Sequence, residues 1–435
     1  MNLRETLICI LYIASLSFNP VFAKDLSKDY STQEHKDTTA LSSSESKITT
    51  NRSSMELDSS YLSKKVIHQL NLDTRTNYII PTHDFLRGVN EEHQPIDNAF
   101  STHLKYSFRF DPHTYSGSIY KGAYQGIGIS RYYLKDKNEL GSPVAVYLFQ
   151  GGTIAQLGKR HSFNYEWNFG VSGGWKHYDY ETNRNNQIIG SKVNAYLNTN
   201  FFFNWTLSRQ LDLTYGVTLT HFSNGNTEFP NSGLNTVGLK LGLTYKFNDK
   251  VGPAKVLYRP YIPQFPRHIS YDVVMFGSWK RKGVEYQGEM VPATEAYKVF
   301  GLSISPMYNL GYRFRLGVAV DGIYDSSANV YAVDGNGSSD PEFVKVPFRG
   351  QIAMGLSGRA EFVMPFFTIG IGMGGNILYL GKDHKGWYQI LALKMELTKS
   401  SFLHIGYNLK EFHTPNYLMI GIGYRFNNKY PTFHR

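Results

Sequence analysis

Two side chains with complementary chemistry stand two positions apart in the segment Leu219-Thr220-His221-Phe222-Ser223-Asn224-Gly225-Asn226. In a β-strand, residues at positions i and i+2 lie on the same face, so His221 and Ser223 would face the same way. A serine hydroxyl beside an imidazole forms a nucleophile with its general base. The alternative is two polar residues where a strand leaves an apolar environment. The spacing alone supports both interpretations equally.

The strands on either side of this pair alternate in an unusual sense. Residues 233–247 carry Val, Leu and aromatic side chains on one face, and glycines, threonines, Lys240 and Lys246 on the other. Lysines among glycines and threonines do not form a dry core, as a soluble sandwich would require. They fit a polar barrel interior, with the apolar face against lipid. The same alternation in residues 209–223 places His221 and Ser223 on the lipid-facing side.

Similar runs predict sixteen strands between residues 77 and 427. They are longer than the roughly five or six residues usual in soluble sheets and match tilted strands that cross a bilayer. We therefore expect an all-β fold, a transmembrane antiparallel β-barrel of about 14–16 strands in one barrel, because tandem barrels in one chain are rare. The alternative is two eight-stranded barrels. A weak first strand over 77–89 is needed for an even number.

The connections between these strands alternate between short and long. Short ones occur at Ser208, Gly311 and Pro365, and long polar ones at 178–190, 224–232 and 326–345. Outer-membrane barrels have short periplasmic turns and longer external loops. Ser223 is therefore expected at the cell exterior, where its strand ends.

The composition and the N-terminal segment fit an exported membrane protein. Charged residues make up 18% of the 435 residues and aromatic residues 15%, against about 25% charged residues in an ordinary soluble domain. A charged start at Arg4, an apolar stretch and Val21-Phe22-Ala23 predict a signal peptide over 1–23. The single cysteine, Cys9, lies inside it, so the mature chain has no thiol for a disulfide, a metal site or catalysis.

The rest of the chain divides by composition. Residues 24–75 are polar and nearly free of aromatics, which predicts a disordered periplasmic leader. The barrel strands then fall into two sets, over 76–247 and 267–435, separated by a proline-containing linker at 248–266.

A resemblance favours the catalytic interpretation. Residues 219–247, LTHFSNGNTEFPNSGLNTVGLKLGLTYKF, resemble the active-site hairpin of the lipid A 3-O-deacylase (PagL-type) family and of its larger relatives in Bacteroidetes, the acyloxyacyl hydrolases. The H-x-S-N motif followed by P-N-x-G carries the likeness. Broader similarity covers about residues 80–247 and includes Gly190–Ala195, whereas the second half shows no matching motif. The resemblance implies His221 as base, Ser223 as nucleophile, and Asn224, Gly225, Asn226 and Asn231 around the oxyanion or substrate.

One position departs from the family pattern. The acidic residue that orients the histidine in the family falls here on Asn235. An amide oxygen can orient an imidazole, although it supplies no charge to stabilise the imidazolium. Glu228, in the connecting loop, is the alternative orienting residue.

Two functions follow for the chain as a whole. The first is an outer-membrane serine esterase that removes an ester-linked acyl chain from lipid A, with lipopolysaccharide in the outer leaflet as its partner. The second is a non-enzymatic barrel, either a small-solute pore or a structural protein with a relic site. We expect no cofactor, because the scattered histidines show no metal-ligand spacing. We expect no nucleic-acid partner either, because the basic residues that give the net charge of +10 are scattered on an exported chain.

Overall fold

A computed structural model describes residues 66–111, 114–247, 262, 264–335, 341–411 and 414–429. The predicted signal peptide, residues 24–65 of the predicted leader and most of the predicted linker lie outside these residues. No helix within the described part is long and apolar enough to cross a membrane.

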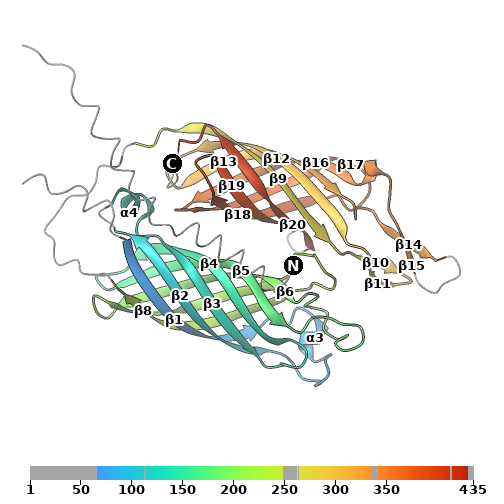
Figure 1. The fold of residues 1–435 in the computed structure, drawn as a ribbon, viewed down its shortest axis with the longest axis horizontal. Helices are drawn as coiled ribbons and strands as arrows, with labels where there is room; N and C mark the ends of the chain where they lie inside the picture. Colours follow the sequence, from blue (N-terminus) through green and yellow to red (C-terminus); the bar gives the residue numbers. More distant parts are fainter. Residues whose placement is uncertain are drawn as a thin grey trace, which may run out of the picture.

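The described chain forms two closed antiparallel barrels of eight strands each, drawn side by side in Figure 1. The first consists of β1 (Val66–Ile79), β2 (Asn98–Phe110), β3 (Tyr124–Leu134), β4 (Gly141–Gln156), β5 (His161–Trp175), β6 (Val193–Thr206), β7 (Leu211–Ser223) and β8 (Leu234–Lys246). The second consists of β9 (His268–Lys280), β12 (Tyr297–Asn309), β13 (Phe314–Asp325), β16 (Ile352–Val363), β17 (Phe367–Tyr379), β18 (Trp387–Glu396), β19 (Ser401–Lys410) and β20 (Thr414–Phe426).

Shorter elements lie in the connections. The second barrel carries two hairpins, β10 (Gly283–Tyr286) with β11 (Glu289–Pro292), and β14 (Tyr331–Asp334) with β15 (Pro341–Val344). The helices are α3 (Asp84–Arg87), α4 (Tyr115–Tyr120) and the 3₁₀ turn η3 (Phe348–Gly350). Both hairpins follow strands that run toward the end of the molecule carrying Ser223, which we call the outer end.

The all-β barrel prediction is confirmed, whereas the preference for one barrel is wrong. β8 pairs with β1, as in Leu243 opposite Leu72, and so closes the first barrel. β9 pairs with β12 and β20 and closes the second. The alternative of two eight-stranded barrels is the correct one. Alternation along a strand reports its two faces but not its neighbours, so it could not distinguish these closures.

The first strand also differs from the prediction. β1 begins at Val66, within the predicted leader, and residues 84–87 of the predicted strand 77–89 form α3 instead. Asn71, Asp73 and Arg75 are 1–7% exposed and point into the barrel, whereas Leu72 is 55% exposed on its exterior. These interior polar residues gave the strand the composition of a disordered segment.

The predicted sense of alternation holds in both barrels. In β8, Leu239 is 66% exposed and Leu241 56%, while Lys240 between them is 3% exposed. The exteriors therefore present apolar side chains, and the interiors hold the charges.

Ion pairs fill the interior of the first barrel. Asp73 accepts a hydrogen bond from Arg75 Nε at 2.8 Å and lies 3.0 Å from Lys105 Nζ and 3.8 Å from Lys240 Nζ. Lys105 also donates to Glu166 at 2.8 Å. Because each charge lies close to an opposite one, this polar interior tolerates burial.

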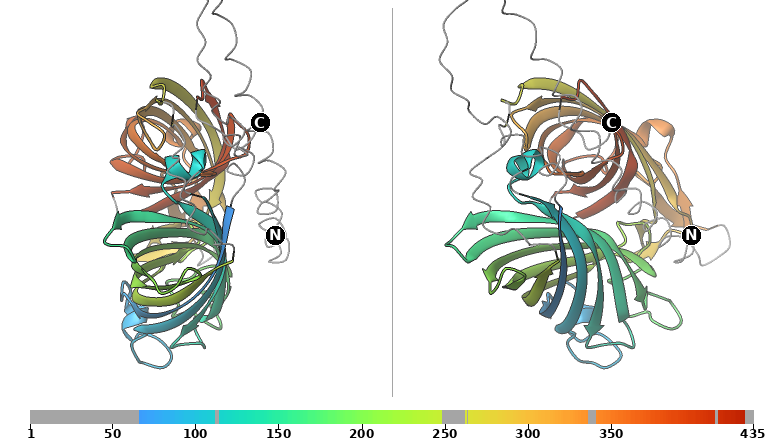
Figure 2. Two further views of the ribbon diagram at one scale, coloured as in Figure 1. Left: turned by 90° about the vertical axis from the view of Figure 1, so that its left-hand side faces the viewer. Right: turned by 60° about the vertical axis from the view of Figure 1, so that its left-hand side comes forward.

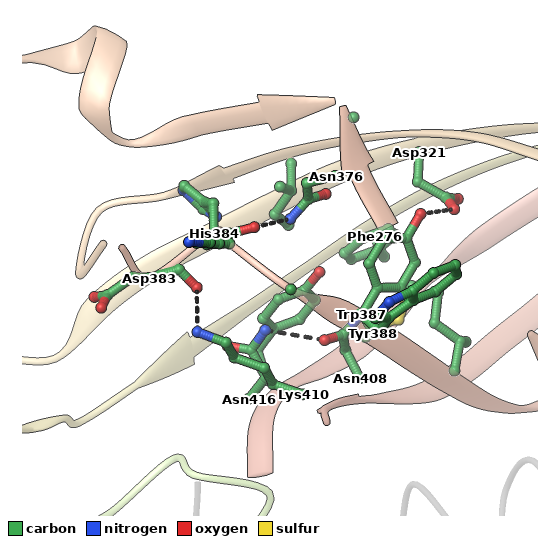
Figure 3. A pocket seen from close by; sticks show the side chains of 17 residues that line it. Phe276, Asp321, Asn376, Asp383, His384, Trp387, Tyr388, Asn408, Lys410 and Asn416 are labelled. Atoms are coloured by element: carbon green, nitrogen blue, oxygen red, sulfur yellow. Dashed lines mark hydrogen bonds between the residues drawn. The ribbon is translucent and has the colours of Figure 1, made fainter. Parts of the chain in front are cut away.

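The second barrel has a similar interior. Asp272 accepts from Arg425 Nε at 2.6 Å and from Lys394 Nζ at 2.8 Å, and Lys394 also pairs with Glu361. Nearer the outer end, Asp321 accepts from Arg359. It also accepts from Tyr388, as Figure 3 shows. The cavities between these side chains have volumes of about 30 and 20 Å³, enough for single water molecules.

The two barrels are in contact along their apolar exteriors, and Figure 2 shows their ribbons next to each other from two further sides. Trp167 of β5 meets Phe367 of β17 edge to face at 5.7 Å between ring centroids. Phe108 of β2 lies 6.1 Å from Phe366, which precedes β17. These contacts fix the second barrel beside the first.

Candidate active site

The strand pairing brings the predicted histidine, serine and Asn235 together. His221 of β7 lies directly opposite Asn235 of β8, and such cross-strand neighbours have adjacent side chains. The Nδ1–H of His221 donates to Asn235 Oδ1 at 2.7 Å, and Nε2 accepts from Ser223 Oγ at 2.9 Å. This tautomer follows from the amide oxygen on Nδ1, and it leaves Nε2 free to take the serine proton.

The residue between His221 and Ser223 anchors the pair from inside the barrel. Phe222 is fully buried, and its ring centroid lies 5.0 Å from that of Tyr132 and 4.9 Å from that of Trp175. Because β7 alternates, this anchored ring holds the serine and the imidazole on the outside. Ser223 is 6% exposed and His221 partly exposed.

The loop after Ser223, residues 224–233, is organised by its own amides and is called the active-site loop below. The N–H of Asn224 donates to Asn231 Oδ1 at 3.0 Å, and Asn224 Nδ2 donates to the carbonyl oxygen of Glu228 at 3.0 Å. Gly225 and Asn226 have φ angles of +67° and +66°. A left-handed turn of this kind suits glycine and asparagine and reverses the chain directly behind Ser223.

Glu228 does not face the histidine. Its carboxylate lies 3.4 Å from Arg281 Nε, at the end of β9 in the second barrel. The Nδ1–H of His221, on the side of the ring away from Ser223, donates to Asn235 instead. Of the eight residues singled out in the sequence, six lie beside Ser223 or in the loop that follows it, whereas the side chain of Glu228 pairs with Arg281 of the second barrel.

A second outer loop, between β5 and β6, supports the active-site loop. The N–H of Gly233 donates to the carbonyl oxygen of Ile188 at 3.0 Å. A Cβ built on Gly190 would lie 2.3 Å from the carbonyl oxygen of Pro230, so only glycine fits this close approach of two backbones. Sequence reasoning missed Ile188, although the likeness at Gly190–Ala195 pointed to this segment.

Glu139, in the outer connection between β3 and β4, joins the outer loops of the first barrel. Its carboxylate accepts from the N–H of Glu91 at 2.8 Å, and its carbonyl oxygen accepts from Asn183 and Asn186. Burial, with Asp136 nearby, raises the pKa of Glu139 to about 7. This carboxyl therefore titrates near neutral pH.

Comparison with known families identifies both barrels. The family model described as lipid A 3-O-deacylase (PagL) matches residues 101–244, and the model described as acyloxyacyl hydrolase, C-terminal domain, matches residues 269–428. Together the two matches span more than two thirds of the chain. The chain belongs to the lipid A 3-O-deacylase (PagL) family. Like the family, it is a β-barrel protein of the outer membrane.

Two solved structures are among those similar to this chain. The outer membrane enzyme PagL is 14% identical with a TM-score of 0.28, and the match covers 40% of this chain and 97% of that one. Neisserial surface protein A is 10% identical with a TM-score of 0.29, over 41% of this chain and 97% of that one. No curated protein matches the chain.

Proposed function

We propose that this protein is an outer-membrane serine esterase that removes an ester-linked acyl chain from lipid A. The observation that carries the proposal is the continuous hydrogen-bonded row from Ser223 through His221 to Asn235. It lies on the apolar exterior at the outer end of the barrel, where a lipid of the outer leaflet would meet it. Family membership supplies lipid A as the substrate class.

The row supports an acyl-transfer cycle. Ser223 Oγ attacks the ester carbonyl carbon while His221 Nε2 takes the hydroxyl proton. When the tetrahedral intermediate collapses, Nε2–H gives that proton to the departing alkoxide oxygen of the lipid, which leaves as an alcohol, and an acyl-serine remains. Water then attacks the acyl-serine with His221 again as base, which releases the fatty acid and restores Ser223. Asn235 holds the imidazole in the tautomer that both steps require.

The oxyanion donor is assigned to the loop directly after Ser223. The N–H of Asn224 already donates to Asn231 Oδ1, whereas the N–H of Gly225 has no acceptor among the described residues. We assign the Gly225 N–H to the developing oxyanion. Asn224 and Asn231 then act by fixing the turn that presents it. Asn226 belongs to the contact with the second barrel described below.

The alternative of a small-solute pore fits the interiors poorly. Buried ion pairs cross the first barrel around Asp73 and the second around Asp272. The described cavities of the second barrel have room for water molecules only. A pore would need a continuous open path.

The proposal is tested by mass spectrometry of lipid A incubated with the purified protein in mixed micelles. Loss of the mass of one acyl chain, with the matching free fatty acid, supports the esterase. Intact lipid A at high enzyme concentration would contradict it. The position of the lost chain identifies the ester that is cut.

A further inference from the structure

The second barrel contacts four residues of the active-site loop. A Cβ built on Gly225 would lie 3.4 Å from Leu418 Cβ of β20. The carbonyl oxygen of Asn226 accepts from the Arg281 N–H at 3.0 Å. The Glu228 carboxylate pairs with the Arg281 side chain at 3.4 Å, and the Phe229 ring lies so close to Gly283 that a Cβ there would be 2.7 Å from Phe229 Cε2.

The groups that hold the loop are themselves fixed within the second barrel. Asn226 Nδ2 donates to the carbonyl oxygen of Asn416 at 3.3 Å. The Asn416 side chain donates to Asn408 Oδ1 at 2.9 Å and accepts from Lys280 Nζ at 3.3 Å. Figure 3 shows Asn416 beside Asn408. The part of the second barrel that contacts the loop is therefore itself held in place by hydrogen bonds within that barrel.

We propose that the second barrel is a built-in positioning device for the active-site loop, with Arg281 as its main polar contact and Leu418 as its apolar one. This inference rests on the proposed esterase function, because the loop it holds carries the Gly225 N–H next to Ser223. Arg281 and Leu418 are positioning residues, since neither lies on the reacting atoms.

The geometry gives the contact a catalytic consequence. Gly225 follows the nucleophile by two residues and lies against Leu418, and its left-handed φ of +67° is part of the turn that presents its N–H. A misplacement of about 1 Å in an oxyanion donor can lower a rate about a hundredfold. Releasing the loop from the second barrel should therefore lower kcat while leaving the lipid-facing binding surface, and hence KM, nearly unchanged.

The test uses charge reversal and charge exchange in the full-length protein. Arg281→Glu places two carboxylates together, and the double variant Arg281→Glu with Glu228→Arg restores an opposite pair. Lys282→Glu is the matched control, because Lys282 pairs at 2.5 Å with Asp383 of the second barrel itself, at similar exposure. Leu418→Ala removes the apolar contact without a change of charge.

Two readouts are measured for each variant. The first is kcat and KM for acyl release from lipid A. The second is amide hydrogen exchange over residues 224–231, which reports the loop whether or not the protein is an enzyme. Heat-modifiable migration on gels checks that both barrels remain folded.

We expect Arg281→Glu and Leu418→Ala to lower kcat about tenfold with little change in KM, and to speed exchange in the loop. The exchanged pair should return both values to within about threefold of the original protein, and Lys282→Glu should change neither. Unchanged exchange in both Arg281→Glu and Leu418→Ala would overturn the inference. An inactive original protein whose loop exchange still responds would refute the esterase but retain the positioning contact.

Discussion

The contact between His221 and Asn235 yields the sharpest prediction. Asn235→Ala removes the only acceptor seen on the imidazole Nδ1–H within the described residues, at 2.7 Å. The ring then loses both its tautomer and its orientation toward Ser223. Because a positioned general base typically contributes about 10²–10⁴-fold, we expect kcat to fall about a hundredfold.

The opposite change should raise the rate. Asn235→Asp keeps the length of the side chain and adds a charge about 4 Å from the centre of the imidazolium that forms in the transition state. At an effective dielectric constant near 20, the attraction is worth up to about 4 kcal/mol. Desolvation of a carboxylate beside lipid cancels much of it. We expect a net gain of about 1.4 kcal/mol, or about tenfold in kcat.

The assay is the initial rate of fatty-acid release from lipid A in mixed micelles, with Glu228→Gln as the matched control. That control should lose only a few-fold, because the Glu228 carboxylate faces Arg281. A crippled Glu228→Gln beside a fully active Asn235→Ala would show that Glu228 orients the histidine in the working enzyme. An Asn235→Asp variant no faster than the original would refute the argument from charge.

Three further predictions concern the outer loops. Because the pKa of Glu139 is raised, its contribution to the free energy of folding is complete below the unfolded pKa near 4.5 and is lost as the pH rises through about 7. A protease should therefore cleave the outer loops faster at about pH 8.5 than at about pH 5.5. Glu139→Gln should remove this difference. Gly190→Ala should lower kcat about tenfold, because its Cβ would lie 2.3 Å from a backbone oxygen of the active-site loop. Gly158→Ala, which has open space around it, should leave kcat unchanged in the same assay. In the Cys9→Ala variant, which has no other cysteine, an impermeant thiol reagent on intact cells should label Tyr180→Cys, because Tyr180 is 76% exposed in an outer loop. The reagent should not label Ser208→Cys in the opposite turn, and the reverse pattern would invert the topology.

The sequence specified the site more fully than the closure of the barrels. The two faces of β7 and β8 follow from alternation alone, and the family resemblance points to Asn235 as the cross-strand partner of His221. The contacts that hold the active-site loop join Glu228 to Arg281 and Asn226 to Asn416. Nothing local to either segment encodes these long-range pairs.

The start of β1 also could not be predicted from the local sequence. Its interior carries Asp73 and Arg75, which are stable there because Lys105 and Lys240 of other strands complete the ion pairs. In isolation these residues have the composition of a polar leader. Only the closed barrel explains why a strand begins at Val66.

The central claim is that Ser223, activated by His221, cleaves an acyl ester of lipid A. The most direct measurement compares the purified protein with its Ser223→Ala variant on lipid A, by mass spectrometry of the lipid and of the released fatty acid. Ser223 is not part of the buried hydrophobic cluster that includes Phe222, so the variant should fold as two intact barrels. The account predicts loss of one acyl chain with the original protein and none with the variant. Equal deacylation by both would contradict it.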